Sequence, residues 1–217
     1  MDPRGPFPVE RAPIYPADCV SQQPHEAGVA RAFVAVELPA DLLKALNGVQ
    51  AELRGRGVRA RWTRAENLHL TLKFLGPLPA GRLRAVTDAM QWAAAEYAAF
   101  ELTAAGIGVF PGIRRARVLW VGLTEAAPVL TRLQRSLDER LGEIGFAREG
   151  RGFQGHLTLG RFSAIPPDGL IADVVSAYAS ERFGSFKVRE VVLFQSDLRP
   201  QGPVYTALAK AQLRDPR

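Results

Sequence analysis

Two copies of one tetrapeptide carry two of the three histidines in this chain, the residue type best suited to acid–base chemistry near neutral pH. The letters His69-Leu-Thr-Leu72 return as His156-Leu-Thr-Leu159, and the only other histidine is His25. Side chains alternate between the two faces of a β-strand, so each motif histidine shares a face with the threonine two positions on. The matched pair predicts two equivalent strands, each presenting an imidazole and a hydroxyl to a shared cleft.

Two imidazoles and two hydroxyls suit the cleavage of a phosphodiester without a metal ion. One group must take a proton from the attacking oxygen while another gives a proton to the departing oxygen. Histidine has an ordinary pKa of about 6.5, so near neutral pH one copy can act as the base and the other as the acid. The hydroxyls of Thr71 and Thr158 can donate hydrogen bonds to the non-bridging phosphate oxygens, where the negative charge rests.

Other catalytic plans lack their residues. A zinc or iron site needs a third protein ligand, and no His-Glu-x-x-His, cysteine pair or carboxylate cluster accompanies the two histidines. The Gly-x-Ser-x-Gly elbow of serine hydrolases and the Gly-x-x-x-x-Gly-Lys-Ser/Thr phosphate loop are also absent. We therefore expect neither a metal nor a cofactor.

The sequence around the motifs alternates helical and extended patterns. Apolar residues recur at helical spacing over residues 40–55, 83–97, 129–141 and 170–178, and β-rich runs cover 31–38, 58–63, 68–75, 100–109, 118–123, 186–195 and 204–210. Tight glycine and proline turns, as at residues 199–202, favour antiparallel pairing over a doubly wound sheet. We predict an α+β fold of two similar lobes, each an antiparallel sheet with helices packed outside, and an active-site cleft between the lobes.

Composition divides the chain into a short extension and a basic body. Residues 1–30 hold six prolines and no apolar period, which predicts a flexible N-terminal extension, and residues 31–217 form the bilobal domain. His25 and Cys19 fall in the extension, where we expect no chemistry. The extension has four carboxylates and two arginines, so the formal charge of +6 leaves +8 on the body. Such a body fits a polyanionic partner such as RNA.

Cysteine usage and hydropathy bear on the setting. The single cysteine excludes an internal disulfide and is typical of a reducing, cytoplasmic environment. No apolar run approaches the roughly 20 residues that a membrane-spanning helix needs. We expect a cytoplasmic monomer with no membrane partner.

The two motifs resemble those of a known family. The segments from His69 to Gly76 and from His156 to Arg161 are similar to the signatures of the two-histidine phosphoesterase superfamily, and above all to the RNA 2′,3′-cyclic phosphodiesterases, historically called 2′-5′ RNA ligases. The resemblance extends from Arg31-Ala-Phe-Val-Ala-Val-Glu-Leu-Pro39 to Pro203-Val-Tyr205. It implies a bilobal α+β fold and the opening of a 2′,3′-cyclic phosphate to a 2′-phosphate without metal or ATP. It also implies the reverse reaction, which joins RNA ends through a 2′-5′ linkage.

Carried onto this chain, the resemblance implies that His69 is the proton donor, that His156 is the proton acceptor and that Thr71 and Thr158 bind phosphate. Arg161 matches the arginine after the second motif, although strict alternation from His156 would point it to the opposite face. Either a strand end or bulge at Gly160 returns it to the cleft, or Arg161 is a surface residue, and we favour the former interpretation.

Lys73 has the strand parity to face the cleft and is a weaker substrate-binding candidate. The alternative, a lysine at the strand end that extends into solvent, agrees equally well with the sequence. Three alternatives remain open at this point. The same chemistry could act on 2′-5′ oligonucleotides or on a small cyclic nucleotide, and a third possibility is a non-catalytic RNA-binding module.

Overall fold

A computed structural model describes residues 29–215 of the 217-residue chain. The predictions for His25, Cys19 and the rest of residues 1–28 lie outside the described residues. The nine strands are β1 (Val29–Glu37), β2 (Arg61–Trp62), β3 (His69–Pro79), β4 (Phe100–Phe110), β5 (Val118–Glu125), β6 (His156–Arg161), β7 (Arg182–Val188), β8 (Glu190–Arg199) and β9 (Gly202–Gln212). The four α-helices are α1 (Ala40–Gly55), α2 (Leu83–Ala95), α3 (Ala127–Glu143) and α4 (Asp168–Ala177), and a short 3₁₀ turn, η1, covers Ala65–Asn67.

The strands form one curled sheet in the order β7-β4-β5-β6-β3-β1-β8-β9, with β2 paired to the outer part of β6. Neighbouring strands in this order pair antiparallel. The two halves of the sheet meet where Leu70 of β3 pairs with Leu157 of β6. Because these leucines hold the same position in the two motifs, the motifs lie side by side at the centre of the molecule.

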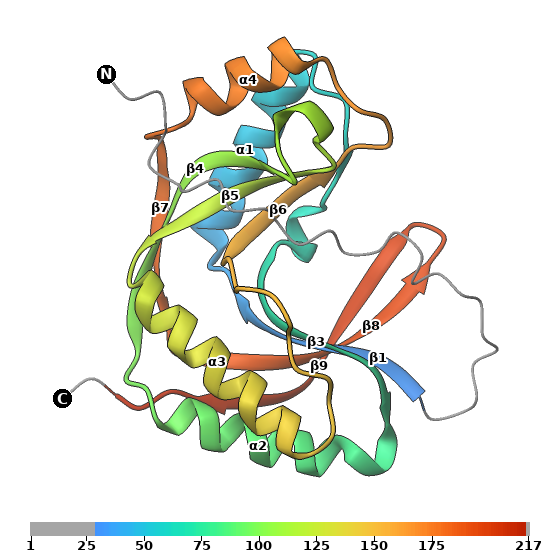
Figure 1. The fold of residues 1–217 in the computed structure, drawn as a ribbon, viewed down its shortest axis with the longest axis vertical. Coiled ribbons are helices and arrows are strands. Elements are labelled where there is room, and N and C mark those ends of the chain that lie inside the picture. Colours follow the sequence, from blue (N-terminus) through green and yellow to red (C-terminus); the bar gives the residue numbers. More distant parts are fainter. Residues whose placement is uncertain (1–28, 216–217) are drawn as a thin grey trace.

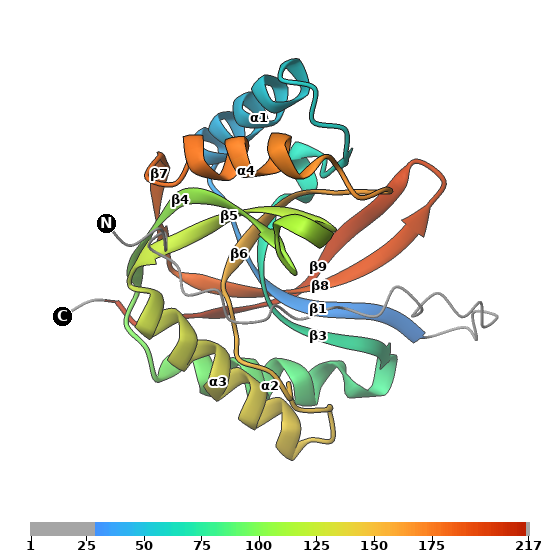
Figure 2. The same ribbon diagram turned by 45° about the horizontal axis from the view of Figure 1, so that its top comes forward.

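The helices pack in pairs on the two halves, which form the two lobes. Helices α1 and α4 contact β7 and β4, whereas α2 and α3 contact each other and the lobe of β3, β8 and β9. Figures 1 and 2 show the two pairs at opposite ends of the molecule, with the sheet between them. The α+β class and the two lobes are therefore confirmed.

The lobes are interleaved along the chain. Helix α1 directly follows β1 but crosses to pack on β7. Helix α3 follows β5 and still contacts it, but it packs mainly on α2 and β3 of the other lobe. Each lobe thus takes segments from both halves of the sequence, and the sheet runs continuously between the lobes.

The apolar spacing predicts the helices, and their buried faces confirm it. In α1 the residues Leu42, Leu46, Val49 and Leu53 are all buried in the main core. Strand β3 is longer than expected, because it continues through Pro77 to Pro79. Prolines are tolerated here since this part of β3 pairs with β1 alone, which leaves one edge free of partner strands.

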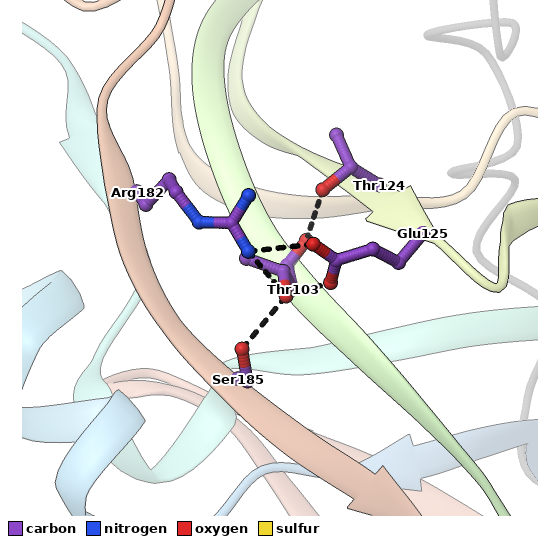
Figure 3. Close-up of polar contacts among 5 residues, drawn as sticks. All are labelled: Thr103, Thr124, Glu125, Arg182 and Ser185. Atoms are coloured by element: carbon purple, nitrogen blue, oxygen red, sulfur yellow. Dashed lines mark hydrogen bonds and ion pairs between the residues drawn. The ribbon is translucent and has the colours of Figure 1, made fainter.

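A polar network fastens the outer strands β7, β4 and β5 (Figure 3). Buried Thr103 bonds Glu125, and its hydroxyl lies 2.7 Å from that of Ser185, while Arg182 donates to Glu125 at 2.6 Å. The hydrogen bond from Thr103 and then the contact with Arg182 lower the pKa of the Glu125 carboxyl. The network holds the edge strand β7 against β4. Strand β4 in turn pairs with β5, which pairs with β6, the strand of the second motif.

Candidate active site

Both motif histidines are held in the same way. His69 and His156 are the first residues of β3 and β6. The His69 Nδ1 atom lies 2.8 Å from the backbone oxygen of Asn67, and the His156 Nδ1 atom lies 2.9 Å from that of Gln154. A carbonyl oxygen can only accept, so Nδ1 carries the hydrogen in each ring. The Nε2 atom of each imidazole is left to exchange a proton with a substrate.

The strand register brings the four predicted residues together. Leu70 pairs antiparallel with Leu157, so one step outward His69 stands opposite Thr158 and Thr71 opposite His156. Opposite residues point to the same face of a sheet. The two imidazoles also interact electrostatically, since the charge of His156 adds to burial in lowering the pKa of His69. On this face of the sheet, each imidazole therefore stands opposite the hydroxyl of the other motif.

Aromatic rings support each imidazole. The ring centroid of His69 lies 4.8 Å from that of Phe33 and 5.3 Å from that of Tyr205, which meets it edge on. His156 meets Phe110 edge on at 5.0 Å. These aromatic contacts limit ring rotation and exclude water from one side of each imidazole.

A glycine makes room for the aromatic support of His156. The Trp120 ring packs 4.9 Å from Phe110 and lies directly over Gly108, where an added Cβ would be 2.2 Å from the indole. Only glycine lets the indole lie this close to β4.

Burial makes both histidines weak bases. Desolvation lowers the pKa of His69 from 6.5 to about 4, with a smaller contribution from the charge of His156, while the hydrogen bond to Asn67 opposes the change. Desolvation also lowers the pKa of His156, and nearby Arg161 lowers it further. Both imidazoles are therefore neutral at pH 7 when the site is empty.

The predicted position of Lys73 is wrong. Val34 of β1 pairs with Lys73 and Ala35 pairs with Thr71, so Leu72 is an extra residue, a β-bulge. The bulge reverses the alternation, which puts Lys73 on the core side and Phe74 on the side of His69 and Thr71. Strict alternation from His69 would place Phe74 on the apolar face, but its side chain is 47% exposed.

Lys73 makes structural contacts in place of substrate contacts. Its side chain is fully buried, its Nζ atom forms an ion pair with Asp138 of α3, and it donates to the backbone oxygen of Ala147 at 2.7 Å. The Asp138 carboxylate also accepts the backbone N–H of Glu149 at 3.1 Å. The pair ties the first motif to α3 and to the segment that leads to the second motif.

Arg161 lies on the face where the bulge hypothesis placed it. Trp120 pairs with Thr158 and Leu119 pairs with Gly160, so the extra residue is Leu159, one position before the predicted Gly160. Arg161 thereby returns to the side of His156 and Thr158. Its charge adds to burial in lowering the pKa of His156, and it opposes the effect of burial on the pKa of Tyr205. Its contact with substrate stays a prediction.

A cavity of about 270 Å³ opens beside His69, between η1 and the start of β9. Asn67, Phe194 and Tyr205 contribute to its lining, and the Asn67 amide donates to the Pro203 oxygen at 3.0 Å. The sequence did not identify Asn67 and Tyr205 as site residues, because each contacts a distant segment. Asn67 bonds Pro203, which is 136 residues further along the chain, and Tyr205 contacts His69 on another strand. The sequence shows Phe33 and Phe110 as aromatic residues but does not place them beside the imidazoles.

The described residues include no group of three or more histidine, cysteine, aspartate or glutamate side chains arranged to hold a metal ion. No helix within residues 29–215 is long and apolar enough to cross a membrane. Two lobes whose central strands each carry a His-x-Thr motif define the class of the two-histidine phosphoesterases.

Comparison with known proteins specifies the family. The family described as LigT like Phosphoesterase matches residues 36–120 and again 121–205. An RNA 2′,3′-cyclic phosphodiesterase of Archaeoglobus fulgidus is 37% identical over 82% of this chain and 97% of its own length, and that of Methanothermobacter thermautotrophicus is 36% identical over 81% and 95%. The chain belongs to the LigT-like phosphoesterase family.

Solved structures agree with this assignment. The protein TT0787 of Thermus thermophilus superimposes with a TM-score of 0.72 at 30% identity, covering 86% of this chain and all of that one. The apo form of LigT from E. coli gives a TM-score of 0.67 at 26% identity, covering 87% of this chain and all of that one.

Proposed function

We propose that this protein hydrolyses the 2′,3′-cyclic phosphate ends of RNA to 2′-phosphomonoesters, without a metal ion. The observation that carries the proposal is the pairing of Leu70 with Leu157, which sets two Nδ1-anchored imidazoles on one face of adjacent strands. The names of the archaeal relatives support the same substrate. The basic body, with its formal +8, supports an RNA partner.

The reaction needs one proton to be removed and one to be delivered. In our scheme the Nε2 atom of His156 takes a proton from water, the water oxygen attacks phosphorus, and the bond from phosphorus to O3′ breaks. His69 gives its Nε2 proton to O3′, so the product has a free 3′-hydroxyl and a 2′-phosphate. With the 5′-hydroxyl of a second RNA in place of water, the same proton transfers form a 2′-5′ linkage.

Thr71, Thr158 and Arg161 supply the phosphate contacts in this scheme. The two hydroxyls stand on the same face of neighbouring strands as the imidazoles, each opposite one of them, where each can donate to one non-bridging oxygen. The guanidinium of Arg161 adds a positive charge on the side of His156. Together these groups hold the anion while both imidazoles reach it.

The lowered pKa values require the substrate to bring the site into its active protonation state. Both imidazoles are neutral in the empty site at pH 7, so the donor must take up a proton. A bound phosphate anion favours the charged form of a neighbouring imidazole and so raises its pKa. Because the His69 pKa is about 4 in the empty site, its role as donor rests on this effect.

A substrate with sulfur in place of O3′ separates the two assignments, because a thiolate departs without needing a proton. If His69 is the donor, His69→Ala retains most of its activity on the sulfur substrate and His156→Ala does not. The opposite pattern would exchange the two roles.

The proposed function is tested with an RNA that ends in a 2′,3′-cyclic phosphate, in the presence of EDTA. We expect turnover to a 2′-phosphate that EDTA does not reduce. Loss of turnover in EDTA would contradict the metal-free scheme, and binding without turnover would identify an RNA-binding module. We also propose that residues 31–217 act as one bilobal domain, because one continuous sheet supplies both motifs. The single cysteine supports a cytoplasmic setting, in which we propose that the protein is a monomer.

A further inference from the structure

Gln50 of α1 is a buried amide that bonds to the backbone beside the second motif. Its side chain is 1% exposed, and it lies on the apolar face of the helix with Leu46 and Leu53. A polar group this deeply buried costs stability unless it is hydrogen bonded. Its hydrogen bonds therefore show what this position does.

Both N–H groups of the amide donate to backbone oxygens. One bonds the oxygen of Thr63 at 2.8 Å, and the other bonds the oxygen of Leu159, 109 residues away, at 2.9 Å. The backbone N–H of Thr63 also donates to the Leu159 oxygen at 2.9 Å. The amide thus clamps β2 and its following residue onto the carbonyl of one particular residue of β6.

Leu159, whose carbonyl accepts these hydrogen bonds, is the extra residue of the β-bulge in β6. This residue reverses the alternation of β6 and brings Arg161 to the side of His156. Bulged residues lie outside the regular ladder, so their carbonyls need other donors. The next residue, Gly160, packs so closely on β2 that an added Cβ would lie 3.2 Å from the backbone oxygen of Arg61.

We propose that Gln50 is a positioning residue that fixes the Leu159 bulge and thereby holds Arg161 toward the phosphate site. The inference rests on the proposed function for the role of Arg161, but the positioning itself is a property of the empty protein. Gln50 does not touch the substrate, and it acts through the backbone of β6.

The variant Gln50→Met tests this, because methionine keeps the length and bulk of glutamine but has no N–H to donate. Gln134→Met is the matched control, since Gln134 is another glutamine buried in a helix, 5% exposed, on α3 of the other lobe. The first readout is the pKa of His156, measured by NMR titration of its ring protons in the absence of substrate. Two titratable or charged groups interact electrostatically with His156: Arg161, whose charge lowers the pKa of His156, and His69, whose own pKa is lowered by His156.

Removing the positive charge in Arg161→Met should raise the pKa of His156. We expect Gln50→Met to raise it in the same direction, because a relaxed bulge lets Arg161 move away, and Gln134→Met to leave it unchanged. A His156 pKa that responds to Arg161→Met but not to Gln50→Met would overturn the proposal.

The second readout is kcat/KM on the cyclic-phosphate RNA. A hydrogen bond between charged partners corresponds to about tenfold or more in affinity, so Arg161→Met should raise KM by about that factor. Gln50→Met should lose up to about tenfold in kcat/KM, and the double variant should be no worse than Arg161→Met alone. If the loss of kcat/KM in the double variant were the product of the two single losses, Gln50 would not act through Arg161.

These readouts separate the failure of the two proposals. If the wild type does not turn over the RNA but Gln50→Met and Arg161→Met move the His156 pKa together, the function is wrong and the positioning stands. If Gln50→Met does not fold, Gln50→Asn keeps a neutral amide that is one methylene shorter and cannot reach both oxygens. It should then give a smaller change of the His156 pKa in the same direction, and no change would refute the inference.

Discussion

The ion pair between Lys73 and Asp138 allows a prediction that tests the corrected position of Lys73. The Lys73 side chain is 0% exposed and that of Asp138, on α3 (Figure 1), is 13% exposed. In Asp138→Ala the ammonium stays buried and keeps the Ala147 oxygen, at 2.7 Å, as an acceptor. Removing one partner of a buried pair costs roughly 3–5 kcal/mol. We expect the free energy of unfolding to fall by about that amount.

Replacing the other partner of the ion pair, Lys73, should reduce stability less. Lys73→Met removes the buried charge and fills its space, and Asp138 remains partly exposed with the Glu149 N–H as a donor. We expect a loss of about 1–3 kcal/mol from the broken hydrogen bonds. The double variant Lys73→Met/Asp138→Leu should recover to within about 2 kcal/mol of the wild type, because an apolar pair of similar volume can replace a buried ion pair.

Urea unfolding at pH 7 measures these differences, and kcat/KM is measured on the same samples. Arg84→Ala is the control, since the Arg84–Asp88 pair is 93% and 55% exposed and should contribute less than about 1 kcal/mol. Lys73→Met should keep the wild-type kcat/KM. The reasoning would be refuted if folded Lys73→Met lost tenfold or more in kcat/KM, or if Asp138→Ala were no less stable than Arg84→Ala.

Three further predictions concern the histidines and their support. The profile of kcat/KM against pH reports the free protein, and its maximum lies between the pKa values of the two imidazoles. Since both values are lowered, this maximum should lie below about pH 6.5, and a maximum above pH 8 would contradict the lowered pKa values. The lowered pKa of His69 contributes stability that is present above pH 6.5 and is lost as the pH falls toward about 4, which amounts to about 3 kcal/mol at about 1.4 kcal/mol per pH unit. His69→Gln should therefore reduce the fall in the free energy of unfolding with decreasing pH, measured by urea unfolding. An unchanged fall would exclude His69 as its source. In Gly108→Ala the new Cβ would lie 2.2 Å from the Trp120 ring, so the free energy of unfolding in urea should fall by about 1–3 kcal/mol. Turnover should also fall, because the displaced indole no longer supports the Phe110 ring beside His156. Wild-type stability and turnover would show that the indole can move freely.

The fold class and the motif strands could be predicted because their signals are local. Apolar spacing places the helices, as in α1, where the four apolar residues at helical spacing named above are all buried. The turn at residues 199–202 was also correctly predicted, with β8 ending at Arg199 and β9 beginning at Gly202. The repeated tetrapeptide predicts a shared face because residues two apart on a regular strand point the same way.

The positions beyond the tetrapeptides depended on bulges, and a bulge leaves a weak signal in sequence. Alternation counted from His69 places Lys73 in the cleft, but the extra residue Leu72 turns it into the core. The same device at Leu159 brings Arg161 back to the site. The Arg161 prediction anticipated a bulge because a basic residue had to be reconciled with its motif, whereas nothing about Lys73 required one.

Contacts between distant segments were the other missing part. The amide of Gln50 reads as one polar residue on a helix until Leu159 is placed beside it. The crossing of α1 and α3 between lobes was also hidden, since helical spacing shows that a face is buried but not which strands cover it.

The central claim, that two imidazoles from two motifs form one site, is tested most directly by turnover of the cyclic-phosphate RNA in three single variants and one double variant. Each of His69→Ala and His156→Ala should lose about 10²–10⁴ in kcat, and the double variant should fall little further, because each group acts only with the other in place. His25→Ala should match the wild type. Wild-type kcat in either motif variant would contradict the account.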